Sequence, residues 1–191
     1  QTPQAGADVL VVTKGPYPSG NSTKAIAGYA AAFGHSDPRD NPDIHFADVV
    51  RNGIGLCNQK LVHTWVNRIC ALTEEMTGWG MDLIQDGNKY SQTPWEGHTY
   101  PRMVNHNRTT GKYVMKCLAE KSADIGINAL AHTIIGGLLK TGPKTEDPVC
   151  GAWGVDYKTG EALLFKAKAV ITTTGGMGAM FPVTDNVSLT T

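Results

Sequence analysis

The sequence predicts an α/β fold, a sheet domain interrupted by a helical excursion. Residues 7–13 (ADVLVVT) form a continuous apolar run rich in β-branched residues, which is typical of a buried parallel strand. Residues 58–77 place apolar side chains at helical spacing. Residues 149–165 hold two short apolar runs on either side of a turn that contains Gly160, and this pattern predicts a β-hairpin. Strand, helices, hairpin and a further strand in this order indicate an α/β sheet domain.

Composition excludes several classes of protein. In a chain of 191 residues, 17 basic residues balance 17 acidic ones, so nothing favours a nucleic-acid partner. No run of about 18 apolar residues exists, so no direct membrane span is expected, and the first residues carry no signal-peptide pattern. The four cysteines form no C-x-x-C motif, so we expect no metal or iron–sulfur site within the chain and a reduced, cytoplasmic protein. They are Cys57, Cys70, Cys117 and Cys150.

The first half of the chain is predicted to be a strand followed by helices. The strand stops at Lys14-Gly15-Pro16, and Ser19 to Ser22 form a small polar turn. Residues 44–51 have helical spacing, and residues 58–77 are the clearest helix, with Asn58 as N-cap. The face predicted to be buried in the second of these helices carries Leu61, Trp65, Ile69 and Leu72, and in the first Ile44, Ala47 and Val50.

The second half is predicted to return to the sheet. Residues 86–88 are a turn, and residues 110–123 form a helix with Val114, Cys117 and Leu118 inward. Residues 125–139 hold one or two apolar runs ahead of the hairpin. Residues 168–173 form a last strand, expected as a parallel neighbour or near neighbour of residues 7–13.

That last strand runs into Thr173, Thr174, Gly175 and Gly176. A buried strand that ends on paired glycines is how α/β proteins bring bare backbone against a ligand, and the hairpin-then-strand order resembles the closing segment of an FAD-binding domain. The alternative is a surface hairpin followed by a flexible Gly/Thr loop. A dinucleotide fold should also open with a strand, G-x-G-x-x-G and a helix, which residues 1–6 cannot supply. The chain is therefore expected to be a fragment or to be completed by another polypeptide.

Four sequence blocks, in order, resemble the succinate dehydrogenase/fumarate reductase flavoprotein family, which includes L-aspartate oxidase and the adenylylsulfate reductase α subunit. They are AGADVLVVTKG with SGNSTKAIAG, DIHFADVVRNGIGLCNQKLVHTWV, EGHTYPRMVNHNRTTGKYVMKCL, and GEALLFKAKAVITTTGG. The blocks span nearly the whole chain but only part of the family's length. The resemblance implies a partial FAD-binding domain of the Rossmann-like, glutathione-reductase type over residues 1–191. Within it, residues 7–34 would be the second strand and flavin loop, 44–123 a helical insertion, and 125–181 the hairpin and closing strand.

The resemblance implies that FAD is held by loop residues throughout the chain. Several relatives have a histidine just after the loop serine, bonded covalently to the flavin, and here Gly20 follows Ser19, so we expect noncovalent FAD. Ala27-Gly28 matches a Gly-Gly pair beside flavin and substrate, and Ala27 with Tyr29 beside it puts dicarboxylate specificity in doubt. The predicted cofactor-binding residues are Thr13, Lys14, Gly15, Ser19, Gly20, Asn21, Ser22, Lys24, Ala27, Gly28, Ala131, His132, Thr173, Thr174, Gly175 and Gly176.

His98 and Arg102 are the candidate catalytic residues. A guanidinium suits a carboxylate, and a histidine beside a flavin could move protons. The family's proton-delivering arginine lies in a later domain that this chain does not contain, and a structural role for His98 and Arg102 is the favoured interpretation.

The implied function is that of an FAD-dependent oxidoreductase. The flavin would exchange a hydride with a dicarboxylate and pass electrons to an iron–sulfur partner subunit, with the protein cytoplasmic or attached to a membrane only through its partners. Two enzyme alternatives remain, adenylylsulfate reductase-like and L-aspartate oxidase-like chemistry. A third is a non-catalytic assembly subunit with a flavoprotein fold. Residues 1–191 alone are expected to be inactive.

Overall fold

The chain divides into two compact units, which are described separately. One unit comprises Gln1–Asn21 with Ala119–Thr191, and the other comprises Ser22–Leu118. This computed structural model describes residues 6–187. The boundary at Ser22 falls inside the predicted flavin loop, because the chain turns there through η1 (Asn21–Lys24), a short 3-10 helix.

The first unit contains a short parallel strand pair. β1 (Leu10–Val12) pairs with β6 (Asn128–Leu130), with Leu10 opposite Asn128 and Val12 opposite Leu130. The strand predicted over residues 7–13 is confirmed in place but is shorter, and Leu10 is 48% exposed, so the expectation of a fully buried strand is wrong. Burial of a parallel strand needs neighbours on both edges and cover on both faces, whereas β6 is the one neighbour of β1 within residues 6–187.

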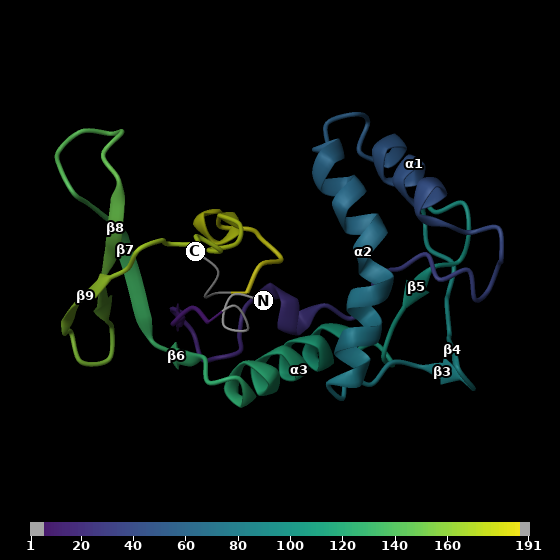
Figure 1. The fold of residues 1–191 in the computed structure, drawn as a ribbon, viewed down its shortest axis with the longest axis horizontal. Coiled ribbons are helices and arrows are strands. Elements are labelled where there is room, and N and C mark those ends of the chain that lie inside the picture. Colours follow the sequence, from purple (N-terminus) through teal and green to yellow (C-terminus); the bar gives the residue numbers. More distant parts are fainter. Residues whose placement is uncertain (1–5, 188–191) are drawn as a thin grey trace. The chain divides into compact units, whose positions relative to one another are not determined.

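A three-stranded antiparallel sheet forms the rest of this unit's regular structure (Figure 1). It consists of β7 (Thr133–Lys140), β8 (Val149–Asp156) and β9 (Ala162–Lys166). The predicted hairpin is confirmed as β8 and β9, with Gly160 in the left-handed conformation in its turn (φ 77°). The indole of Trp153 lies over the bare backbone of Gly136 and Gly137, where a β-carbon on Gly136 would overlap the ring.

The predicted closing strand is not formed. Residues 168–173 have no strand partner among the described residues, and Ile171 is 79% exposed. β1 pairs with β6 and not with this segment, so the expectation that the two are strand neighbours is wrong. An apolar, β-branched run becomes a strand only when a partner backbone supplies hydrogen bonds, which the sequence of the run itself does not reveal.

Three helices dominate the remainder. α1 (Pro42–Asn52) and α2 (Gln59–Gly78) lie side by side (Figure 1), and α3 (Thr110–Asp124) runs across the boundary between the units. Asn58 caps α2 as predicted, since its side chain accepts from the amides of Lys60 (3.1 Å) and Leu61 (3.3 Å). Asn41 caps α1 in the same way, with Pro42 in the first turn.

The buried faces of α1 and α2 differ from the prediction. α2 buries Val62, Val66 and Thr73, and Leu61 is exposed. α1 buries His45 and Asp48, and Ala47 is exposed. In α2, the predicted and the observed buried faces both have helical spacing, so the pattern alone allowed either. In α1, the assumption that polar side chains face water selected the wrong face.

The core of the second unit lies between α2, α3 and four short strands. β2 (Tyr29–Ala30) pairs with β5 (Met103–Val104), and β3 (Gln85–Asp86) with β4 (Lys89–Tyr90) around the predicted turn at Gly87. The buried core cluster contains Ala31, Met81, Leu83, Tyr90, Val104 and Cys117. Cys117 of α3 is inward as predicted, whereas Leu118 is 37% exposed and its predicted inward placement is wrong. All four cysteines are free thiols.

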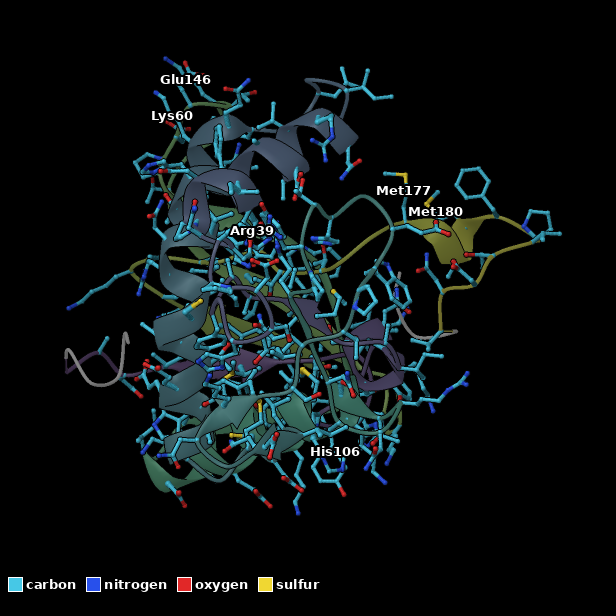
Figure 2. All side chains as sticks on the ribbon, turned by 90° about the vertical axis from the view of Figure 1, so that its right-hand side faces the viewer. Arg39, Lys60, His106, Glu146, Met177 and Met180 are labelled. Carbon is cyan, nitrogen blue, oxygen red and sulfur yellow. The ribbon has the colours of Figure 1, made fainter. Side chains whose placement is uncertain are left out.

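A short helical turn follows the sheet along the chain. η2 (Gly178–Met180) follows Met177, and the side chains of Met177 and Met180 project from this segment (Figure 2). Among residues 6–187, no helix combines the length and the apolar character needed to cross a membrane.

Candidate functional site

The end of β1 lies against the segment that joins β6 to β7. The Thr13 amide donates to the carbonyl of Leu130 (2.9 Å), and the Thr133 amide donates to the carbonyl of Thr13 (3.1 Å). The amide of His132 points to the carbonyl of Gly15 at 3.5 Å, a weak contact. Thr13, Lys14 and Gly15 are therefore brought beside Ala131 and His132. All five are predicted cofactor-binding residues, although the two groups are far apart in sequence.

His132 has an unusual backbone at this junction. Its φ of 62° is in the left-handed region, and its Nδ1 lies 2.9 Å from the hydroxyl of Tyr157. A non-glycine residue in this conformation turns the chain sharply between β6 and β7. A strained residue beside a strand end is a feature found at ligand sites.

The polar loop after β1 is tied to the C-terminal segment of the same unit. Asn21 donates from Nδ2 to Oδ1 of Asn186 (2.5 Å), and its own Oδ1 accepts from the amide of Val187 (2.9 Å). Beside it, Gly20 has a φ of 93°, and a β-carbon there would have no atom within 4 Å. The loop thus offers backbone with open space beside it.

The Thr173–Gly176 segment offers bare backbone as well. Gly175 has a φ of 78°, and β-carbons on Gly175 and Gly176 would meet nothing within 4 Å. No close packing at these positions explains why glycine is needed there. Glycine in a left-handed conformation suits a loop whose backbone amides face a ligand. The first unit therefore offers, at predicted cofactor-binding positions, a strand end, a left-handed residue and two loops of open glycine backbone.

The second unit holds Ser22, Lys24, Ala27 and Gly28. A cavity of about 180 Å³ lies here, lined by Ser22, Ala25, Gly28, Tyr29, Thr110, Gly111 and Val114. Gly111, in the first turn of α3, donates its amide to the carbonyl of Ala25 (2.8 Å), and a β-carbon on it would overlap the carbonyl of Ser22. Close packing of the α3 N-terminus on residues 22–25 thus fixes the second half of the loop.

Gly28 is held just as tightly. Its φ is 142°, and a β-carbon there would overlap the carbonyl oxygen of Val104 in β5. The next residue, Tyr29, donates its hydroxyl to Thr73 Oγ1 of α2 (3.0 Å). Burial, partly offset by this hydrogen bond, raises the pKa of Tyr29 to about 12. Tyr29 therefore remains a neutral phenol that fastens the loop's end to α2.

Arg102 is fully buried between two carboxylates. Its Nε and Nη2 donate to Asp40 (3.2 and 2.7 Å), and its Nη1 lies 3.0 Å from Oδ2 of Asp48. The Nη1 contact has the distance of an ion pair but not the angle of a hydrogen bond. This guanidinium is already matched by charge and shielded from solvent, which favours the structural interpretation of Arg102.

His98 and His45 lie at the edge of the same cluster. The ring centroids of His45 and His98 are 6.0 Å apart. Neither ring nitrogen of His45, nor Nδ1 of His98, hydrogen-bonds to any of the residues 6–187. Burial, reinforced by Arg102, lowers the pKa of His98 and lowers that of His45 to about 4. Both imidazoles are therefore neutral near pH 7.

The two aspartates respond differently to burial. Burial raises the pKa of Asp40, although Arg102 opposes that effect. For Asp48, burial works in the same direction but is outweighed by the hydroxyl and amide of Thr99 and by Arg102, so its pKa is lowered. Asp48 also binds Arg51 at 2.5 Å on the exposed side. Sequence reasoning did not identify Asp40, Asp48 or His45 as members of this cluster. The one available signal was that the polar residues of the predicted helix 44–51 also repeat at helical spacing.

A parallel strand pair, a helical excursion and glycine-rich loops are consistent with a nucleotide-binding class of protein, and comparison with known proteins identifies the family. Residues 1–189 match the FAD binding domain family, and the chain belongs to it. The resemblance to the succinate dehydrogenase/fumarate reductase flavoproteins is thereby confirmed.

Individual relatives agree with this assignment. The chain is 33% identical over 180 residues to a fumarate reductase (CoM/CoB) subunit of Methanothermobacter marburgensis, covering 93% of this chain and 32% of that one. It is 27% identical over 190 residues to L-aspartate oxidase of a Synechocystis species, covering 96% of this chain and 32% of that one. The chain spans about a third of the length of these curated relatives.

Solved structures share the fold. The Sdh1 complex of Mycobacterium smegmatis in its apo form superposes with a TM-score of 0.88 at 28% identity, covering 98% of this chain and 33% of that chain. Adenylylsulfate reductase from Archaeoglobus fulgidus superposes with a TM-score of 0.71 at 24% identity, covering 93% and 27%, and shows the fold alone. The predicted FAD-binding fold is confirmed, including its helical excursion.

Proposed function

We propose that this chain is the FAD-holding part of a flavoprotein oxidoreductase that acts on a dicarboxylate. The observation that carries the proposal is the hydrogen-bonded junction of Thr13–Gly15 with residues 130–133, in a chain of the FAD binding domain family. When bound, FAD would supply the acceptor or donor of a hydride.

The chain's own residues bind and orient. In the first unit, the strand end at Thr13 and the segment at His132 would hold the adenosine, and the amides around Gly20 and Gly175 would face the pyrophosphate. In the second unit, Ala27 and Gly28 would present backbone amides to the isoalloxazine or to a substrate carboxylate. The close contact of Gly28 with the Val104 carbonyl and the hydrogen bond from Tyr29 to Thr73 would hold this turn in place.

The dicarboxylate is favoured by the fumarate reductase relative at 33% identity. An amino-dicarboxylate is the second candidate, because L-aspartate oxidases are 27% identical to this chain. We further propose that an iron–sulfur subunit takes up the electrons and that the protein is cytoplasmic, reaching a membrane only through partners.

The test uses the protein as its natural gene encodes it. The purified protein is expected to be yellow, with flavin absorbance bands, and to reduce fumarate with a reduced dye as electron donor. Oxidation of aspartate with no fumarate reduction would shift the assignment to the second candidate. A folded, colourless protein that takes up no added FAD would refute the proposal and favour a non-catalytic assembly subunit.

A further inference from the structure

A buried ionic cluster, Arg102 with Asp40 and Asp48, lies next to the strand that supports the flavin-side turn. All three side chains are at most 6% exposed. Asp40 belongs to the loop before α1, Asp48 to α1 itself, and Arg102 directly precedes β5. One guanidinium therefore joins three separate segments of the second unit.

The backbone of Arg102 connects this cluster to β2. Its carbonyl accepts from the Ala31 amide (2.9 Å), and the next residues, Met103 and Val104, pair with Ala30 and Tyr29. Val104 is in turn the residue whose carbonyl contacts Gly28 so closely that a β-carbon would not fit. Met103 and Val104 of β5 thus connect the ion-paired Arg102 to the contact with Gly28.

A shift of Arg102 must consequently move β5 and the backbone of Gly28. The other side of β5 cannot absorb the movement freely, because Thr93 and Met103 exchange hydrogen bonds of 3.0 and 3.2 Å. Close packing transmits small displacements of this kind. A displacement of about 1 Å at a binding group is enough to change affinity or rate markedly.

We propose that Arg102 is a positioning residue, which sets the placement of the Ala27–Gly28 turn against the flavin through β5, and that it contacts neither flavin nor substrate. This inference rests on the proposed function, since it presumes that Gly28 faces bound flavin. It assigns to the buried arginine a role in tuning the cofactor rather than in binding a carboxylate substrate.

The test is Arg102→Lys in the protein as its natural gene encodes it. Lysine keeps the positive charge but cannot bind Asp40 through two nitrogens while reaching Asp48 with a third. We expect FAD to bind about tenfold more weakly, with a shifted flavin midpoint potential. Gly28→Ala, which pushes on Val104 directly, should shift the potential as well.

The matched control is Arg51→Gln. Arg51 binds the same carboxylate, that of Asp48, but its side chain is 60% exposed and belongs to α1, with no backbone link to β5. We expect its FAD affinity and midpoint potential to equal those of the wild type. If Arg51→Gln shifted the midpoint potential as much as Arg102→Lys does, the loss of any contact to Asp48 would be sufficient to change the potential. That result would overturn the role of β5.

A purely structural role predicts a different pattern. Arg102→Lys would then lower the melting temperature and leave the FAD affinity and midpoint potential of the folded protein unchanged, which would overturn the proposal. If Arg102→Lys does not fold, Asp40→Asn replaces it, because the amide keeps one oxygen acceptor for Arg102. An unchanged midpoint potential in Asp40→Asn would likewise overturn the proposal. A wild-type protein that binds no flavin refutes the proposed function, and this inference falls with it.

Discussion

The imidazole of His45 packs edge-on against the indole of Trp65, with the ring centroids 4.9 Å apart and the histidine fully buried. Arg102, His98 and Asp48 are the charged or titratable groups that influence it, and burial dominates in lowering its pKa to about 4. The folded protein therefore binds a proton at this site less readily than the unfolded chain does.

The first prediction concerns acid. A histidine whose folded-state pKa is depressed contributes full stability above the unfolded pKa of about 6.5 and loses it as the pH falls toward 4. We expect about 2 kcal/mol less free energy of unfolding at pH 5 than at pH 7.5 from this group. Urea unfolding at both pH values should show that the free energy of unfolding depends less on pH in His45→Phe than in the wild type. His63→Gln, at an exposed position of α2, should keep the wild-type slope; equal slopes for all three proteins would contradict the prediction.

The second prediction compares two helical glycines. Gly111→Ala places a methyl group against the carbonyl of Ser22 and should lower the free energy of unfolding by about 1–3 kcal/mol. Gly78→Ala, at the exposed end of α2 with no atom within 4 Å of the new methyl, should be neutral or stabilise by up to about 1 kcal/mol. Urea denaturation of the two variants measures both, and similar losses would show that α3 does not pack closely on the loop.

The third prediction concerns the hydroxyl of Tyr29. Tyr29→Phe removes its hydrogen bond to Thr73 and should cost about 0.5–1.5 kcal/mol of stability, because Thr73 keeps its own bond to the Ile69 carbonyl (2.7 Å) and is not left without a partner. Tyr157→Phe is the matched control, since its hydroxyl contacts His132 at an exposed position. Its loss should stay within about 0.5 kcal/mol. Indistinguishable unfolding curves for the two variants would count against a fastening role for Tyr29.

The fourth prediction concerns the attachment of the flavin. Gly20 follows Ser19 where flavinylated relatives have a histidine, so no imidazole is available there to form a covalent bond. Acid precipitation of the purified natural protein should leave the yellow colour in the supernatant, measured by absorbance. Colour that stays in the protein pellet would show a covalent bond at another residue.

The local features of the fold were predictable because they depend on neighbours within a few residues. The cap at Asn58 needs only amides two and three residues ahead, and the β8–β9 hairpin needs only the turn at Gly160 and its flanking apolar runs. The family was predictable for another reason, because four ordered motifs identified it. The assignment of the loops at Thr13, Ser19 and Thr173 to the flavin follows from that resemblance and stays a prediction.

The positions of individual side chains were less predictable. Arg102 was a candidate catalytic residue for which a structural role was the favoured interpretation, and it is 0% exposed and paired with Asp40 and Asp48. Those partners are 62 and 54 residues away along the chain, and only folding brings the opposite charges together. The same holds for Tyr29 and Thr73, which join the flavin loop to α2.

By itself, the sequence determined the positions of the helices, the β8–β9 hairpin and its turn, and that the chain belongs to a flavoprotein family, because periodicity, capping and motif order are local properties. The tertiary structure alone decided that α2 turns Val62 and Val66 inward instead of Leu61, since both stripes satisfy a helical period and only the shape of the opposing core chooses between them. It also decided that residues 168–173 form no strand, because strand formation depends on a hydrogen-bonding partner that a segment's own sequence does not contain.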